Sequence, residues 1–135
     1  MKFQPEKSDL PSIRGYGPGW VSIDGERVTQ SFAIGSRGQR IDWQCTRFAD
    51  LTLEHFSKLA EFSPELVIFG SGERIRFPRP DWLQTLYARR IGLETMDMAA
   101  ACRTYNILAA EGRDVVLALL IETPENETAQ PGILP

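Results

Sequence analysis

Residues 92–121 have the sequence GLETMDMAAACRTYNILAAEGRDVVLALLI, which predicts a strand, a helix and a second strand in direct succession. Asp97 is a favourable N-cap for a helix that runs to Glu111, and Gly112 stands where a glycine often ends a helix. The continuous apolar run over residues 115–121 is typical of a strand covered on both faces of its sheet. This succession indicates an α/β domain.

The preceding stretch repeats the alternation of helices and strands. Thr52 is a suitable N-cap for a helix that ends at residue 62, and residues 65–69 have the composition of a short buried strand. A second helix is predicted over residues 80–90, with a proline at its start. Together with the quoted stretch, this order predicts a mixed sheet with helices packed against it.

The first third of the chain is predicted to be β structure. Residues 20–23 and 27–34 flank Asp24-Gly25, a dipeptide typical of two-residue hairpin turns. Residues 39–43 continue as a further strand. This N-terminal β-hairpin region either extends the mixed sheet or forms a layer of its own.

Length and composition indicate one domain of ordinary size. The chain has 135 residues, of which 42% are hydrophobic and 24% are charged, as in globular proteins. We expect a single α/β domain over residues 12–122. It is preceded by a loose lead-in over residues 1–11 and followed by a disordered tail over residues 123–135.

Charge and hydropathy exclude several classes of partner. The net charge of -3 provides no general attraction to nucleic acid or to anionic lipid and leaves open only a local basic patch. The longest apolar run is too short to span a bilayer, and the polar N-terminus does not resemble a secretory signal. Cys45 and Cys102 fit no CxxC spacing and are expected to be free thiols. We therefore expect a cytoplasmic protein that binds no nucleic acid and inserts into no membrane.

Residues that commonly serve catalysis or metal binding are few. His55 is the only histidine, and an exposed residue on its helix is the simplest interpretation. Cys102 lies among apolar residues and is expected to be a buried, inert thiol. One histidine and two distant cysteines predict no metal site, and no catalytic motif is present. We expect no cofactor, and the absence of a catalytic motif favours a non-catalytic protein over an enzyme.

One glycine-rich loop follows a predicted strand. Gly70-Ser71-Gly72 comes directly after residues 65–69, where α/β proteins often place ligand-binding loops. The loop lacks the third glycine of a dinucleotide fingerprint, the Gly-Lys-Ser/Thr of a P-loop and the first glycine of a nucleophile elbow. It is either a tight structural turn or a site for an anion or another ligand, with Arg74, Arg76 and Arg79 close by in sequence.

The predicted helix over residues 97–111 carries a stripe of small and polar residues. The stripe consists of Ala99, Arg103, Asn106 and Ala110. Small residues beside Arg103 and Asn106 indicate that another backbone approaches closely. We therefore expect both polar side chains to be largely buried and bonded to backbone carbonyls or carboxylates. The alternative is that this stripe lines a pocket.

Three segments taken in order resemble a known family. They are LVIFGSG (residues 66–72), GLETMD (92–97) and AACRTYNILAAEGR (100–113). The chain resembles, over about residues 13–121, a small uncharacterised-domain family of bacteria and archaea whose relatives include a mitochondrial assembly factor for respiratory complex I. The resemblance implies a three-layer α/β fold with a central mixed sheet, no established enzymatic activity and no known cofactor.

The resemblance also indicates candidate site residues. The family's recurrent residues match this chain at Gly70, Gly72, Met96, Arg103, Tyr105, Asn106, Glu111 and Arg113. Combined with the loop and the helix stripe, they leave Gly70, Ser71, Gly72, Arg103, Asn106 and Arg113 as candidates for contact with a ligand or partner.

Two functions remain open. The first is a non-catalytic protein-binding or assembly-factor domain with an unidentified protein partner, linked through the resemblance to the assembly of respiratory complexes. The second is a protein that binds a small molecule or anion, or an undiscovered enzyme, through loop 70–72 and the Arg103/Asn106 face of the helix. An exposed apolar patch without a closed cavity favours the first function, and a concave pocket in which these residues converge favours the second.

Overall fold

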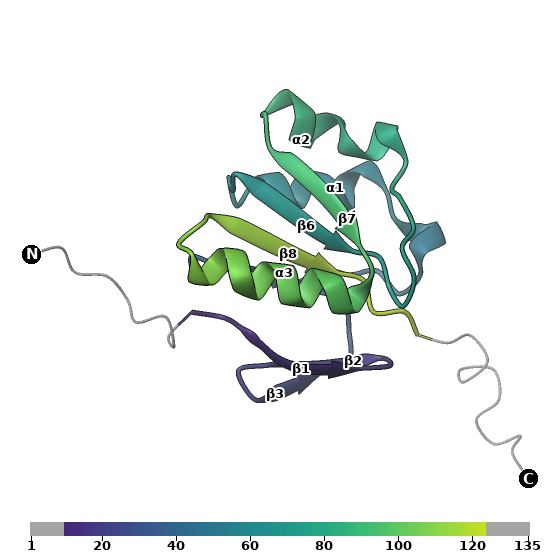
Figure 1. Cartoon of the computed structure of the whole chain (residues 1–135). Helices are drawn as coiled ribbons and strands as arrows, with labels where there is room; N and C mark the ends of the chain where they lie inside the picture. Colours follow the sequence, from purple (N-terminus) through teal and green to yellow (C-terminus); the bar gives the residue numbers. More distant parts are fainter. Residues whose placement is uncertain (1–9, 124–135) are drawn as a thin grey trace, which may run out of the picture.

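The computed structural model describes residues 10–123 of the chain (Figure 1). Its strands are β1 (Ile13–Gly17), β2 (Trp20–Ile23), β3 (Glu26–Val28), β4 (Phe32–Gly35), β5 (Arg40–Asp42), β6 (Leu66–Gly70), β7 (Gly92–Met96) and β8 (Val115–Leu119). Its helices are α1 (Leu53–Ala60), α2 (Gln84–Ala88) and α3 (Met98–Ala110), with 3₁₀ turns η2 (Phe48–Asp50) and η3 (Pro80–Leu83). The predicted lead-in and tail lie outside the described residues, apart from residues 10, 11 and 123.

The strands of residues 10–123 form two sheets. The larger sheet has the strand order β5-β4-β8-β6-β7. In it, β6 pairs in parallel with β7 and β8, and β4 pairs antiparallel with β5 and β8. The smaller sheet is antiparallel and has the order β1-β2-β3. The predicted mixed sheet is confirmed, and the N-terminal hairpin region forms a separate sheet.

The mixed sheet separates two hydrophobic clusters. Side chains of β6 alternate between them: Val67 and Phe69 pack with α1 and α2, whereas Ile68 packs with α3 and the smaller sheet. Figure 1 shows α3 and β1–β3 on one side of the mixed sheet. The predicted three-layer arrangement, with a central sheet flanked by helices, is confirmed.

The Asp24-Gly25 hairpin forms as predicted, but residues 27–34 do not form a single strand. Asp24 and Gly25 have φ values of 52° and 94°, as a two-residue turn between β2 and β3 requires. β3 ends at Val28, and the chain enters the other sheet at Phe32. All residues of β4 are buried, whereas β3 is mostly exposed. The two segments occupy different environments, so the chain changes sheets between them.

β1 has little strand character of its own, because it contains two glycines, Gly15 and Gly17. It is held by pairing with β2 and by Asn106 of α3. The Ile13 amide donates to Asn106 Oδ1 at 2.9 Å, and Asn106 Nδ2 donates to the Ile13 carbonyl at 2.7 Å. The Tyr105 hydroxyl adds a bond of 3.0 Å to the Pro11 carbonyl. α3 therefore joins the smaller sheet to the body of the domain.

α3 sits close to the mixed sheet because Gly70, at the end of β6, has no side chain. A Cβ atom on Gly70 would lie 2.3 Å from Leu119 Cδ1 and 3.0 Å from Ala101 Cβ. The Asp97 side chain caps the helix by accepting from the Ala100 amide at 2.9 Å, as predicted. The Met98 amide donates to the Gly72 carbonyl at 2.7 Å. The start of the helix and the loop after β6 are thus fixed to one another.

Asn106→Ala is expected to destabilise the fold. The substitution leaves the amide and carbonyl of Ile13 without their partners in a half-buried position, which typically costs about 1–3 kcal/mol. Arg103→Ala is the matched control on the same helix, and because Arg103 is exposed its free energy of unfolding should change by no more than about 0.5 kcal/mol. Urea denaturation of both variants measures the difference. Wild-type stability of Asn106→Ala would contradict the role given to this side chain.

Candidate functional site

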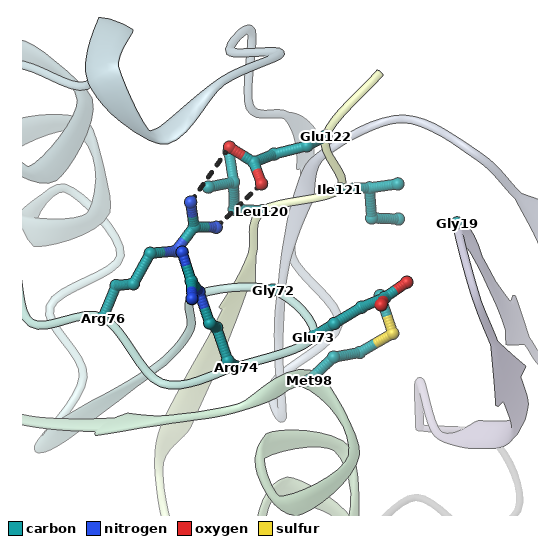
Figure 2. Close-up of a pocket in the computed structure, with 9 residues that line it drawn as sticks. All are labelled: Gly19, Gly72, Glu73, Arg74, Arg76, Met98, Leu120, Ile121 and Glu122. Carbon is teal, nitrogen blue, oxygen red and sulfur yellow. Dashed lines mark hydrogen bonds and ion pairs between the residues drawn. The ribbon is translucent and has the colours of Figure 1, made fainter. Parts of the chain in front are cut away.

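A pocket of about 580 Å³ opens where the loops that follow β6, β7 and β8 meet. Open α/β sheets commonly bind ligands outside the carboxyl ends of their strands. Figure 2 shows that the turn between β1 and β2 faces these loops from the smaller sheet. The lining residues are Gly19, Gly72, Glu73, Arg74, Arg76, Met98, Leu120, Ile121 and Glu122. The pocket therefore lies between the mixed sheet and the N-terminal hairpin.

An ion pair between Arg76 and Glu122 forms one side of the pocket (Figure 2). Arg76 Nη2 lies 2.8 Å from Glu122 Oε1, and Arg76 Nη1 lies 3.3 Å from Glu122 Oε2. The guanidinium also lies over the ring of Phe48, 4.7 Å from its centroid, and the Phe48 amide donates to Glu122 Oε2 at 2.8 Å. The pair connects the loop after β6 to the segment after β8, and each charge is already compensated within the fold.

The surroundings of Glu122 favour its ionised form. Burial by itself raises the pKa of this carboxyl. The hydrogen bonds from Arg76 and the Phe48 amide, with the positive charges of Arg76 and Arg47, outweigh burial and hold the pKa of Glu122 below its ordinary value. The carboxylate is therefore charged at neutral pH and holds Arg76 in place.

Ser71 fixes the course of the loop after β6. Its side chain is fully buried, and its hydroxyl donates to the Arg74 carbonyl at 3.0 Å and accepts from the Arg76 amide at 2.7 Å. Arg76 Nη2 also donates to the Ser71 carbonyl. Gly72 has a φ of 117°, which favours glycine at this turn. Of the predicted loop 70–72, Gly70 and Ser71 serve the structure and Gly72 lines the pocket.

Glu73 and Arg74 are the uncompensated charges of the pocket. Both are exposed, and neither forms an ion pair with any residue between positions 10 and 123. In Figure 2 the Glu73 carboxylate extends toward Met98 and Gly19, away from the Arg76–Glu122 pair. These two side chains are available to a partner without first breaking an internal bond.

The structure does not bring the other predicted candidates into this pocket. Asn106 lies further along α3 and binds the backbone of β1. Arg113 Nε lies 2.7 Å from Glu65 Oε1, beside the residues with which β6 and β8 begin. Only Gly72 of the candidate set lines the pocket, so the convergence required for the small-molecule alternative is not observed.

The expected burial of Arg103 is wrong. Its side chain is exposed, and its Nη1 donates to the hydroxyl of Tyr16 in β1 at 2.9 Å. The small residues of the stripe do allow the backbone of β1 to approach, but that approach occurs at Asn106. The longer Arg103 side chain extends over the surface of the smaller sheet. The expectation for Asn106 is confirmed in part, because this half-buried side chain binds a backbone carbonyl.

His55, Cys45 and Cys102 are packed or hydrogen-bonded within the fold. His55 is half-buried rather than exposed. Its Nδ1 accepts a hydrogen bond of 3.0 Å from the Thr52 amide in a capping box. The ring proton is therefore on Nε2, which donates to the Gln44 carbonyl. Cys102 is buried, as expected, and burial raises the pKa of its thiol to about 12. Burial also raises the pKa of Cys45. Among residues 10–123, no group of three or more His, Cys, Asp and Glu side chains could hold a metal ion.

The pairing of Arg76 with Glu122 is not predictable from the sequence. The sequence places Arg76 with Arg74 and Arg79 as positive charge close to the glycine loop, and the structure shows that Arg76 is the one of the three that points inward. The signal was its place between two apolar residues, Ile75 and Phe77, in a segment with alternating exposure. Glu122 follows directly after a long apolar run. Nothing local shows that these two residues, 46 positions apart, form a pair.

The match to a family model covers residues 13–120, and the description of that family is "Protein of unknown function (DUF498/DUF598)". The chain belongs to this family. A Homo sapiens relative named NADH dehydrogenase [ubiquinone] 1 alpha subcomplex assembly factor 3 is 32% identical over 124 residues. That alignment covers 90% of this chain and 66% of the human protein, so the chain spans slightly less than two thirds of the relative's length.

Solved bacterial structures have the same fold as this DUF498/DUF598 member. A crystal structure of a Bordetella parapertussis protein is 37% identical, covers 84% of this chain and 97% of its own, and has a TM-score of 0.79. A solution structure from Bordetella pertussis, described as a Mth938-like domain, is 29% identical, covers 94% and 96% of the two chains, and has a TM-score of 0.78. Within residues 10–123, no helix has the length and apolar character needed to cross a membrane.

Glu122→Gln should be less stable than wild type at neutral pH, and the difference in stability between the two proteins should shrink as the pH falls. Since the folded pKa of Glu122 is below its unfolded value, its stabilisation is complete above about pH 5 and is lost as pH falls through the folded pKa. The carboxylate is 36% exposed, so we expect a difference of at most about 1 kcal/mol. Urea midpoints at pH 7 and pH 3 measure it. An unchanged gap between wild type and Glu122→Gln at both pH values would exclude this linkage.

Proposed function

We propose that the chain is a non-catalytic binding domain that acts in the assembly of a multi-subunit protein complex. The observation that carries this proposal is an exposed apolar pair, Ile75 and Phe77, on the loop after β6. Their exposed fractions are 46% and 70%. Large exposed apolar side chains at a defined place on a surface are typical of protein interaction sites.

The exposure of this pair is enforced by the fold. Arg76 stands between the two residues and points inward to Glu122, and its amide is bound by the buried Ser71 hydroxyl. In an extended segment, neighbours of an inward-pointing residue point outward. Ile75 and Phe77 flank Arg76 in the chain, so the contacts that hold Arg76 also restrain the backbone that carries both exposed side chains. The loop therefore presents two apolar side chains on an ordered backbone.

Covering such a pair is energetically favourable. Burial of apolar surface contributes roughly 25 cal/mol per Å², and an aromatic ring presents some 150–250 Å². Pre-ordering of the loop reduces the entropy lost when a partner binds. A few anchor residues of this kind commonly supply most of the binding energy of an interface. This favours a protein partner over a ligand enclosed in the pocket.

The kind of complex is inferred from the relatives. The human relative is named as an assembly factor for NADH dehydrogenase, and the chain aligns with it over most of its own length. We extend this role to the chain: its partner is a subunit or intermediate of a respiratory complex, which it holds until further subunits join. Neither step requires a reaction at the domain itself.

A complementation experiment tests the proposal. In cells of the source organism that lack the endogenous gene, membrane NADH–ubiquinone oxidoreductase activity should fall and should be restored by the wild-type chain. The double variant Ile75→Ser/Phe77→Ser should fail to restore it, because the loss of two anchor residues weakens binding by about tenfold or more. Native gels should show the corresponding subcomplexes accumulating.

Control variants test the Ile75/Phe77 binding surface separately from the role in respiratory assembly. Ile107→Ser and Tyr87→Ser remove other large side chains that are each 58% exposed, on α3 and α2. Both should restore activity. Normal activity in cells without the gene would refute the respiratory link, and full rescue by Ile75→Ser/Phe77→Ser would refute the assignment of the binding surface.

A further inference from the structure

One edge of the mixed sheet is open. β7 is the last strand in the order β5-β4-β8-β6-β7, and within residues 10–123 it pairs only with β6 (Figure 1). Short strands, prolines and bulges protect most sheet edges from further pairing. At the opposite edge, β5 has only three residues. β7 has five residues without a proline, and it pairs with β6 in continuous register, so a further strand can add at this edge.

The hydrogen bonds of β7 show which of its backbone groups point outward. The Gly92 amide donates to the carbonyl of the residue before β6 at 3.2 Å, and the Met96 carbonyl accepts from the amide of the residue after β6 at 2.9 Å. Because backbone groups alternate in direction along a strand, every second residue from Gly92 faces β6. The amides and carbonyls of Leu93 and Thr95 therefore face away from β6, and none of them forms a hydrogen bond within residues 10–123.

The side chains of β7 determine the chemistry of an added strand. Leu93 is half-buried and packs against the cluster on the α1 and α2 side of the sheet, and Thr95 is half-buried on the same side. Glu94 lies on the α3 side, is exposed and forms no ion pair within the part of the chain that the structure describes. The open edge thus carries one unpaired negative charge at its centre, between two half-buried side chains.

We infer that the open edge of β7 binds an extended segment of a partner protein as a sixth strand, with a lysine or arginine opposite Glu94. The outward amides and carbonyls of Leu93 and Thr95 exchange hydrogen bonds with the backbone of the segment, and the side chains give the specificity. The inference rests on the proposed function in taking the occupant to be a segment of a protein partner. It adds a second contact to the surface formed by Ile75 and Phe77.

Charge favours a single basic residue in the segment. Opposite charges that face one another across two strands are stabilising, and like charges in that position are destabilising. Two copies of β7 paired about their centres would place Glu94 opposite Glu94, so charge favours a different chain as the occupant. Arg89 and Arg90 precede the strand, so a run of several basic residues would meet positive charge at that end.

Amide hydrogen exchange of the free chain, followed by NMR, tests whether the edge is open. In dilute solution the amides of Leu93 and Thr95 should exchange at least tenfold faster than those of Glu94 and Met96, because only the latter two donate to β6. Slow exchange of Leu93 and Thr95 in the dilute chain would show that the chain covers its own edge. Protection that grows with concentration would show that a second copy covers it. Either result would overturn the inference.

Peptide selection tests the chemistry of the occupant. A phage-displayed library of random linear dodecapeptides is selected on the wild-type chain, on Glu94→Lys and on Glu111→Lys, which makes the same charge change at the end of α3. The wild-type and control chains should enrich peptides in which a lysine or arginine stands between two apolar or β-branched residues. The Glu94→Lys chain should enrich aspartate or glutamate at the central position.

Affinities of synthetic peptides test the pairing itself. The most enriched wild-type peptide should slow the exchange of the Leu93 and Thr95 amides. It should bind Thr95→Pro at least tenfold more weakly, because proline removes an outward amide and leaves the hydrogen bonds to β6 in place. Urea midpoints close to wild type show that the variants are folded. No enrichment on the wild-type chain, or peptides that bind Thr95→Pro and Glu94→Lys as tightly as wild type, would contradict the assignment.

The outcome is distinguishable from failure of the proposed function. Ile75→Ser/Phe77→Ser should bind the selected peptide as wild type does, because neither residue belongs to β7. If no peptide binds but this variant still fails to restore respiratory activity, the proposed function stands and the edge is not its second contact. If the peptides bind as expected but cells without the gene respire normally, the edge assignment stands and the respiratory role fails.

Discussion

The arrangement of this domain depends on the close approach of α3 to the end of β6 at Gly70. A Cβ atom at that position would lie only 3.0 Å from Ala101 Cβ of the helix and would displace the Leu119 side chain, so a larger residue there would push the helix away from the sheet. From this position the helix contacts both the loop after β6 and the smaller sheet. Its first amide holds the Gly72 carbonyl, and Asn106 holds the backbone of β1. The loop that carries the exposed apolar pair and the hairpin that borders the pocket are therefore both positioned by one helix.

The loop after β6 shows how a short segment can be ordered without regular structure. Its inward contacts are made by Ser71 and Arg76, and the Arg76–Glu122 pair joins it to the segment after β8. On the outside of the loop, Ile75 and Phe77 are exposed beside the charged side chains of Glu73 and Arg74. Two large exposed apolar side chains on one short, internally bonded loop are the physical basis for assigning this surface to a partner.

Much of the fold follows from local patterns, whereas the site depends on distant pairings. The cap at Asp97, the hairpin at Asp24-Gly25 and the buried strands are recognisable because each depends on a few neighbouring residues. β1 is not recognisable, because its two glycines form a strand only when β2 and Asn106 are in place. Arg103 was misjudged because a helix stripe shows which residues share a face and not which element covers it. The Arg76–Glu122 pair spans 46 positions and has no local signature.

Site-specific photo-crosslinking in living cells tests most directly whether the loop after β6 is the binding surface. A photoreactive phenylalanine analogue at position 77 reports contacts of the exposed pair, and the same analogue at position 107 reports an equally apolar but unassigned surface of α3. We predict a defined crosslink to one protein of a respiratory complex from position 77, with none to that protein from position 107. Equal crosslinking from both positions, or no crosslink from position 77, would contradict the account.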